Sequence, residues 1–231
     1  MYYYRPSQAR GRARFGWLDS RHSFSFGHYY DPNHMGFSVL RVINDDTVIP
    51  GAGFDTHGHR DMEIISYILQ GAIEHRDSEG NRLVVSAGEI QRMSAGTGIT
   101  HSEYNHSQTE QLKFLQIWIE PNRQGIKPSY EQQSIPQRDK LTALITPDGS
   151  GNTLSIHQDT SLYRLQLNTG ESITIQTHER PGYLHVIKGE ASVNDKSILA
   201  SGDGLGLFKK QVQLKAIKNS ITALWFDLPA N

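Results

Sequence analysis

The sequence contains no cysteine among its 231 residues. This absence excludes disulfides, thiolate zinc sites, iron–sulfur clusters and cysteine nucleophiles. Long apolar runs are missing as well, since no stretch approaches the ~18 uninterrupted apolar residues that a membrane helix needs. The first residues, Met1 to Pro6, also lack the apolar core of a secretion signal. From these absences we expect a cytoplasmic protein without a membrane partner.

An excess of charge of one sign is also lacking, because the formal net charge is −1. This balance gives no reason to expect nucleic acid or an anionic membrane as a partner. The first 21 residues do contain five arginines. We interpret them as a solvated surface segment rather than as a patch for an anionic partner. We expect a monomer without a nucleic-acid partner.

Short runs rich in β-branched and aromatic residues dominate the chain, and helix-period patterns are scarce. Many short strands at modest spacing are typical of an all-β sandwich or barrel. The polar stretch from 121 to 139 contains Pro128 and Pro136 and reads as a linker with at most a short helix. The runs predicted as strands are residues 37–43, 63–69, 83–85, 114–119, 163–167, 172–175, 183–187, 211–217 and 221–227.

The two halves of the sequence resemble each other. The run 64–69 is followed by Gly71, and the run 183–187 is followed by Gly189 in the same way. Each half then continues with a Gly-Glu or Gly-Asp turn and a closing apolar run. Internal duplication is the economical explanation, and it predicts two β domains of similar plan.

Two short pairs, His57-x-His59 and His101-x-Glu103, follow glycine-rich turn signals. A β-strand alternates its side chains between faces, so residues i and i+2 point the same way. If both segments are strands that line one cavity, three imidazoles and a carboxylate converge. Such a donor set suits one divalent transition metal and leaves room for a further ligand.

The glycines and histidines also occur in the order of the two motifs of the cupin superfamily. In the second motif Ser94 stands where proline is usual. Two ordered motifs at the right separation are far more specific than a lone His-x-His. The positions that fit are Gly51, His57, His59, Glu63 and Gly71 in the first motif and Gly88, Gly96, His101 and Asn105 in the second.

Four phrases, residues 24–32, 40–46, 57–63 and 93–103, resemble the pirin branch of the bicupins over roughly residues 10 to 120. Gly58 departs from the proline that is usual in that family. The resemblance implies a bicupin fold, with two antiparallel β-barrels of the jelly-roll type packed face to face. The implied boundaries are an N-terminal cupin domain with the metal site at 1–121, a linker at 122–139 and a C-terminal cupin-like domain at 140–231.

The resemblance to pirins also implies which residues hold the metal. They are His57, His59, His101 and Glu103. Glu63 occupies the ligand position of the more common cupin pattern, and we expect it instead to lie beside the ligands and orient a histidine. Fe2+ is the favoured metal, with Zn2+, Co2+, Ni2+, Mn2+ and Cu2+ as alternatives.

The second half offers no equivalent ligands. When Gly189 is aligned on Gly71 and Gly202 on Gly88, residues unsuited to metal binding fall on all the ligand positions. We therefore expect one metal, in the N-terminal half. The residues at these positions are Ile175, Thr177, Pro181, Lys215 and Ile217.

The family resemblance implies a metal-dependent dioxygenase that cleaves flavonols such as quercetin, opening the ring with O2 and releasing carbon monoxide. Its partners would be a small aromatic substrate and O2, and Glu103 would be the catalytic base. Two alternatives stay open. One is a metal-containing regulatory or protein-interaction protein of the pirin type, and the other is a different small-molecule cupin enzyme such as an isomerase.

The other histidines fit neither motif. We interpret His75 and His106 as solvent-exposed, and His178 and His185 as surface or hydrogen-bonded residues. The aromatic-rich segment 22–30 either roofs the cavity and stacks on a flat substrate or packs at the edge of the sheet.

Overall fold

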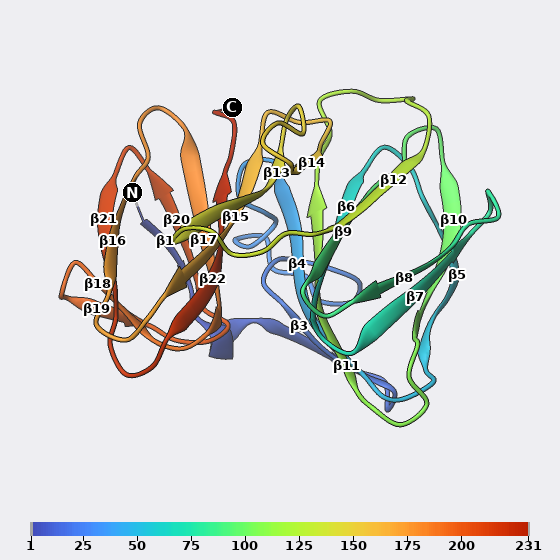
Figure 1. Ribbon diagram of the computed structural model, residues 1–231, viewed down its shortest axis with the longest axis horizontal. Helices are drawn as coiled ribbons and strands as arrows, with labels where there is room; N and C mark the ends of the chain where they lie inside the picture. The colour runs from blue at the N-terminus through green and yellow to red at the C-terminus, as the bar shows by residue number, and fades with distance from the viewer. Residues whose placement is uncertain (1, 231) are drawn as a thin grey trace. The chain divides into compact units, whose positions relative to one another are not determined.

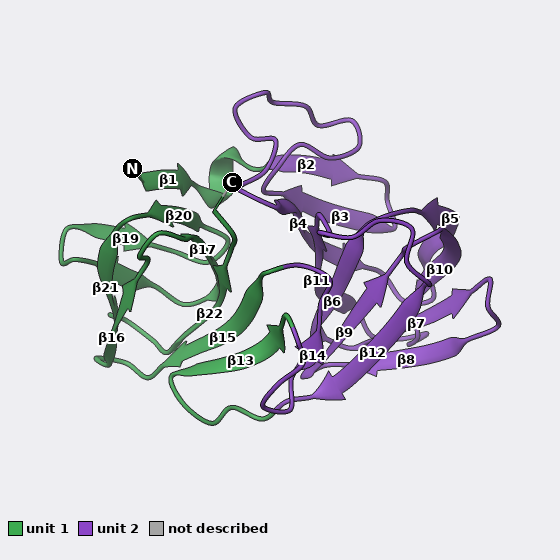
Figure 2. Cartoon of the chain, turned by 90° about the horizontal axis from the view of Figure 1, so that it is seen from above, with its two compact units in different colours: residues 1–10, 136–147, 159–231 green, residues 11–135, 148–158 purple. Residues whose placement is uncertain are grey.

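The computed structural model describes residues 2–230, and apart from one short 3-10 helix the elements in this range are β-strands. The described chain forms two compact units, which Figure 2 colours separately. Unit 2 comprises residues 11–135 and 148–158, and unit 1 comprises residues 2–10, 136–147 and 159–230. The all-β prediction is confirmed, and no helix within residues 2–230 is long and apolar enough to cross a membrane.

Unit 2 contains two antiparallel sheets, which lie at the right of Figure 1. The larger sheet has the order β12-β9-β6-β11-β4-β3-β2, and the smaller has the order β5-β10-β7-β8. The strands of unit 2 are β2 (Gly11–Arg14), β3 (Leu18–His22), β4 (Leu40–Val48), β5 (Gly53–His59), β6 (Glu63–Gln70), β7 (Ala72–Asp77), β8 (Arg82–Ser86), β9 (Glu89–Ser94), β10 (Ile99–Asn105), β11 (Leu112–Ile119), β12 (Ser129–Ser134) and β14 (Leu154–Ser155).

The two sheets of unit 2 enclose two clusters of apolar side chains. One cluster joins Phe114 and Ile68 of the large sheet to Ile73 and Val85 of the small sheet. A second cluster contains Ile64, Met93, Ala95 and Ile99, with Trp118 packed against it. Strand side chains alternate between the two faces of a sheet, so Ile64 and Ile68 of β6 face this interior, whereas Ile65 and Tyr67, which are also buried, lie on the opposite face.

A row of buried polar side chains crosses the large sheet between these two clusters. Residues directly opposite each other on antiparallel strands share a face, so the register places the whole row inside unit 2. Each member of this polar row is at most 5% exposed. In the order of pairing the row consists of His22, Asn44, Gln116, Ser66 and Gln91.

Unit 1 also contains two antiparallel sheets, but its interior is apolar. Leu184, Val186 and Trp225 belong to one large buried cluster that includes Ile175. The main sheet runs β1, β20, β17, β22, β15 and β13, and the second runs β16, β21, β18 and β19. The elements of unit 1 are β1 (Tyr2–Arg5), η1 (Ser7–Ala9), β13 (Leu141–Thr146), β15 (Ser161–Leu167), β16 (Ser172–Gln176), β17 (Pro181–Lys188), β18 (Ala191–Val193), β19 (Ser197–Leu199), β20 (Gly204–Phe208), β21 (Gln211–Ala216) and β22 (Ile221–Asp227).

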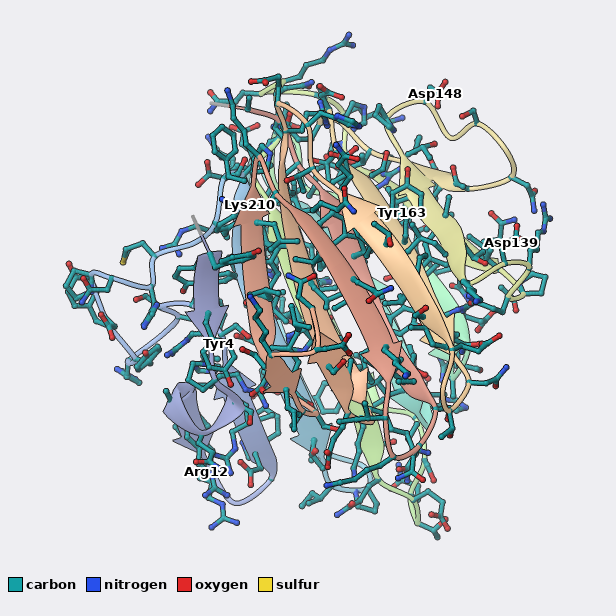
Figure 3. The ribbon with its side chains drawn as sticks, turned by 90° about the vertical axis from the view of Figure 1, so that its left-hand side faces the viewer. Tyr4, Arg12, Asp139, Asp148, Tyr163 and Lys210 are labelled. Carbon is teal, nitrogen blue, oxygen red and sulfur yellow. The ribbon has the colours of Figure 1, made fainter. Side chains whose placement is uncertain are left out.

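The units divide the chain differently from the predicted boundaries at 121 and 140. The N-terminal strand β1, which carries Tyr4 (Figure 3), pairs with β20 of unit 1. The hydroxyl of Tyr4 donates a hydrogen bond of 3.1 Å to Asp203. The predicted linker 122–139 contains β12, which pairs with β9. The segment of β12 is polar and only half-buried, so it lacks the apolar alternation that marks a strand in sequence. The nine predicted strands all coincide at least in part with observed strands.

The register of β5 against β10 is irregular near the metal motif. His101 lies opposite His57, whereas Glu103 lies opposite Phe54, so β5 carries one extra residue between these pairs. Gly53 then passes very close to β10, because a Cβ atom at Gly53 would lie 2.2 Å from the carbonyl oxygen of Glu103. A bulge of this kind turns side chains away from simple alternation and is common beside functional sites.

We expect Gly53→Ala to destabilise the protein by about 1–3 kcal/mol, because the added methyl group must push β10 away. The same displacement moves Glu103, so divalent-metal binding should weaken as well. Gly58→Ala is the matched control on the same strand, since its Cβ would lie 3.7 Å from Thr100 Cγ2, an ordinary contact. Urea unfolding and metal titration of both variants test this, and equal behaviour of the two would contradict it.

Candidate metal centre

Three imidazoles converge where β5 and β10 pair. His57 and His59 lie on β5, and His101 faces them from β10. Their candidate ligand nitrogens lie within 4.8 Å of one another. The ring centroid of His101 is 4.6 Å from that of His57 and 5.0 Å from that of His59. These distances suit three nitrogen donors around one ion.

Glu103 completes this group from the floor of the barrel. Its Oε2 atom lies 3.9 Å from Nε2 of His57 and 4.0 Å from Nε2 of His101. The same oxygen accepts a hydrogen bond of 3.0 Å from Nε2 of Gln116, a member of the polar row. The residue is fully buried, at 0% exposure. One carboxylate oxygen is thus directed toward the histidines.

Burial sets the charge of these groups. It lowers the pKa of His59 to about 4 and that of His101 to about 2, with neighbouring histidines adding to the effect. Burial, together with the nearby Asp46, raises the pKa of the Glu103 carboxyl to about 8. Nδ1 of His57 lies 2.8 Å from the carbonyl oxygen of Asp55, to which it can donate, leaving Nε2 free to act as a ligand. Neutral imidazoles with available lone pairs are the form that binds metals.

Several buried polar atoms of this group lack a hydrogen-bond partner among residues 2–230. They are Nε2 of His59, both ring nitrogens of His101 and Oε1 of Glu103. An unsatisfied buried polar group costs about 1–3 kcal/mol. A divalent cation would satisfy several of these atoms at once, so the donor set fits the metal that the sequence motifs indicate.

His75 is a fifth member of the site, and the interpretation of it as solvent-exposed is wrong. It lies on β7 directly opposite Glu103 and is only 3% exposed. Its Nε2 atom is 3.3 Å from Oε1 of Glu103, and its ring lies 5.5 Å from that of His101. His75, His101 and Glu103 form a second group close enough to hold a cation. Residues two apart on a strand face the same side, so the apolar Ile73 could have indicated that His75 also faces the interior.

The remaining histidines divide between the surface and the interior. The side chain of His106 is 49% exposed and contacts Glu74, and His178 is exposed, as predicted. His185 on β17 is only 1% exposed, which excludes the surface alternative of its interpretation and leaves the hydrogen-bonded one. Within residues 2–230, both groups that could hold a cation lie in unit 2.

Glu63 lies in a separate polar cluster. Its carboxylate accepts a hydrogen bond of 3.0 Å from Ser94 and lies 3.3 Å from Nδ1 of His157. Arg92, which is equally buried, approaches to 3.9 Å. The histidine that Glu63 contacts is therefore His157, in the segment 148–158, and Glu103 is the carboxylate that lies beside the three motif histidines.

A cavity of about 730 Å³ opens onto His57 and His59. Its walls include the aromatic residues Phe26, Tyr29, Phe54 and Trp118, so the segment 22–30 does line the cavity. Trp118 stands edge-on to both His59, at 5.1 Å, and Phe26, at 5.3 Å. A flat aromatic molecule could enter between these rings and reach the histidines.

Comparisons with known proteins agree with this geometry. The pirin family model matches residues 4–119, and the model of the quercetinase C-terminal cupin domain matches residues 143–228. The chain belongs to the pirin family. Quercetin 2,3-dioxygenase of Escherichia coli K12 is 48% identical over 230 residues, with 99% of both chains covered. A putative quercetin 2,3-dioxygenase of Pasteurella multocida is 43% identical, with 97% of both chains covered.

Solved pirin structures share the fold of this family member. The crystal structure of YhhW from E. coli matches with a TM-score of 0.96 and 47% identity, covering 100% of this chain and 99% of that chain. A second structure shows the bacterial pirin YhhW in complex with nickel(II), with a TM-score of 0.95, 46% identity and 100% coverage of both chains. A close relative of this pirin therefore binds a divalent metal.

We expect His75→Phe to weaken divalent-metal binding on the order of 10-fold, because a phenyl ring removes the imidazole nitrogen that lies 3.3 Å from Oε1 of Glu103 and can help to position that carboxylate. Phenylalanine has a volume close to that of histidine, so the fold should persist. His106→Phe is the matched control on an exposed histidine. Competition titrations with a metal indicator measure both dissociation constants, and an unchanged value for His75→Phe would contradict the expectation.

Proposed function

We propose that this protein is a metal-dependent dioxygenase that opens the ring of a flavonol such as quercetin with O2 and releases carbon monoxide. One observation carries the proposal. Three histidine nitrogens and a buried carboxylate converge at the end of an aromatic-lined cavity. The names of the E. coli and P. multocida relatives support the same reaction.

In this proposal His57, His59, His101 and Glu103 hold one divalent transition metal, with Fe2+ favoured. The nickel(II) complex of the E. coli relative supports a divalent metal without choosing among them. When bound, the metal supplies a Lewis-acidic centre that lowers the pKa of the substrate hydroxyl and brings substrate and O2 together. Glu63 is not proposed as a ligand, because its carboxylate contacts Ser94, His157 and Arg92.

Glu103 is proposed as the base that accepts the proton of the flavonol 3-hydroxyl. Its Oε2 atom lies 3.9 Å from Nε2 of His57, which lines the cavity, so a hydroxyl that reached His57 would approach this carboxylate. Without a metal, burial raises the pKa of this carboxyl to about 8, and a raised pKa makes a carboxylate a stronger proton acceptor. Gln116 holds the carboxylate in place by donating to Oε2.

The aromatic walls position the substrate and keep water away from it. Phe26, Phe54 and Trp118 present ring faces and edges to the cavity, and a planar flavonol can pack against them over a large area. Exclusion of water protects the deprotonated, electron-rich substrate from side reactions. The chain therefore supplies orientation, a proton acceptor and a dry site.

Oxygen uptake with quercetin tests the proposal. Metal-reconstituted protein should consume O2 and release carbon monoxide. His101→Ala and Glu103→Gln should lower turnover by at least about 100-fold, since each removes a proposed ligand or the base.

Metal analysis of each variant separates loss of the ion from loss of the base. The absence of O2 uptake by protein with its metal in place would overturn the dioxygenase and favour a pirin-type interaction protein. Conversion of a substrate without carbon monoxide would indicate a different cupin enzyme, such as an isomerase.

Metal binding should also release protons at neutral pH. Because the pKa of Glu103 is raised to about 8, its carboxyl is mostly protonated at pH 7, and a metal needs the ionised form. We expect nearly one proton per metal at pH 7 and fewer as the pH rises above 8. Affinity should accordingly rise with pH up to that point.

Calorimetry in two buffers of different ionisation enthalpy counts these protons. Glu103→Gln is the isosteric control and should release none. An equal count for wild type and Glu103→Gln would exclude Glu103 as the source.

A further inference from the structure

One wall of the cavity is polar although it is buried. Asn44 and Asp46 on β4 both line the cavity, and they are only 2% and 1% exposed. The Oδ1 atom of each lacks a hydrogen-bond partner among residues 2–230. Asp46 also makes no ion pair within that range. We call these two residues the acceptor pair.

Packing does not account for the acceptor pair. Val42 and Val48 share its face of β4, since side chains two apart on a strand point the same way. Valine or leucine at positions 44 and 46 would therefore continue an apolar face, and among the described residues the one interaction lost would be that of Asp46 with the hydroxyl of Ser20 opposite it. Buried polar groups that lack partners destabilise a fold, and functional sites are where proteins retain such groups.

The acceptor pair lies close to the proposed metal centre. Asn44 is directly opposite Gln116, whose side chain donates to Glu103. Asp46 is near enough to Glu103 for its charge to act on that carboxyl. A molecule that occupies the cavity and reaches His57 therefore passes beside both acceptors.

The cavity also offers a donor. Trp118 lines it, and the indole N–H of Trp118 has no hydrogen-bond partner in the described range. A ligand with several hydroxyl donors and a carbonyl acceptor on a planar aromatic frame could satisfy the indole and the acceptor pair together. A purely hydrocarbon ring system would leave all three polar groups unpaired.

We propose that Asn44 and Asp46 accept hydrogen bonds from substrate hydroxyls other than the one that faces the histidines, so that the enzyme selects polyhydroxylated aromatic ketones. This inference rests on the proposed function and specifies its substrate class. A ligand without these hydroxyls would leave the two buried acceptors unpaired. The enzyme would therefore bind such a ligand much more weakly than a polyhydroxylated one.

Anaerobic binding of two flavonols to the metal-loaded protein tests the inference. Quercetin carries several hydroxyls, whereas 3-hydroxyflavone keeps only the reacting hydroxyl and the ketone. Wild type should bind quercetin at least about 10-fold more tightly. Asn44→Leu and Asp46→Leu should each reduce this preference to within about 3-fold while leaving the dissociation constant of 3-hydroxyflavone nearly unchanged.

Gln91→Leu is the matched control. Gln91 belongs to the same polar row and has an unpartnered Nε2 among the described residues, but it is not among the residues that line the cavity. This variant should keep the preference for quercetin. Thermal unfolding supplies a second readout, since Asn44→Leu and Asp46→Leu should have an unchanged or higher Tm if the pair serves binding.

Equal binding of the two flavonols by wild type would overturn the inference, and so would an undiminished preference in both leucine variants. If the leucine variants had a lower Tm but kept the wild-type preference for quercetin, the acceptor pair would have a structural role. That result would overturn the inference as well. Oxygen uptake, measured separately, decides the proposed dioxygenase activity. The preference for quercetin in anaerobic binding tests the role of the acceptor pair. Failure of this inference can therefore be told apart from failure of the proposed dioxygenase activity.

Discussion

β5 and β10 pair antiparallel, and the position of every candidate ligand depends on this pairing. It sets His101 opposite His57, and the shift in register then directs Glu103 toward the same point. A shift of one residue would turn these side chains to the other face of the sheet, because strand side chains alternate. The register is held by the absence of a side chain at Gly53, which lets the backbone of β10 approach at Glu103.

The two units use their interiors differently. In unit 1 the interior is filled by apolar residues, and Ile175 stands where unit 2 has a histidine. In unit 2 a polar row, a buried carboxylate and four histidines interrupt the core. Such groups reduce the stability of the fold when they lack partners. Their retention in unit 2 therefore indicates that this unit gives up some stability for its functional site. An apolar interior in unit 1 is what a domain with a purely structural role requires.

Sequence patterns predicted much of this organisation. The paired motifs identified His57, His59, His101 and Glu103, which the structure brings together at one point. The strand pattern identified an all-β fold with two similar halves. Edge strands such as β12 were missed, because a polar, half-buried strand carries no apolar alternation.

His75, Asn44 and Asp46 could not be assigned to the site from the sequence. His75 occurs in no motif, and the pirin-like phrase 40–46 that contains Asn44 and Asp46 assigned neither of them a role. The partners of all three residues are distant along the chain. His75 meets Glu103 only because β7 pairs with β10, and Asn44 reaches Gln116 only because β4 pairs with β11. Strand pairing of this kind depends on the register of the whole sheet, which local sequence patterns do not encode.

The amino-acid sequence by itself determined the fold class, the family and the motif residues of the metal centre, because these depend on residue type and short spacing. Only the tertiary structure decided which other buried groups surround that centre and where the cavity lies. The physical reason is that hydrogen bonding between strands brings together residues far apart in sequence. Burial then changes the pKa of Glu103 and the histidines in a way that no isolated segment would show.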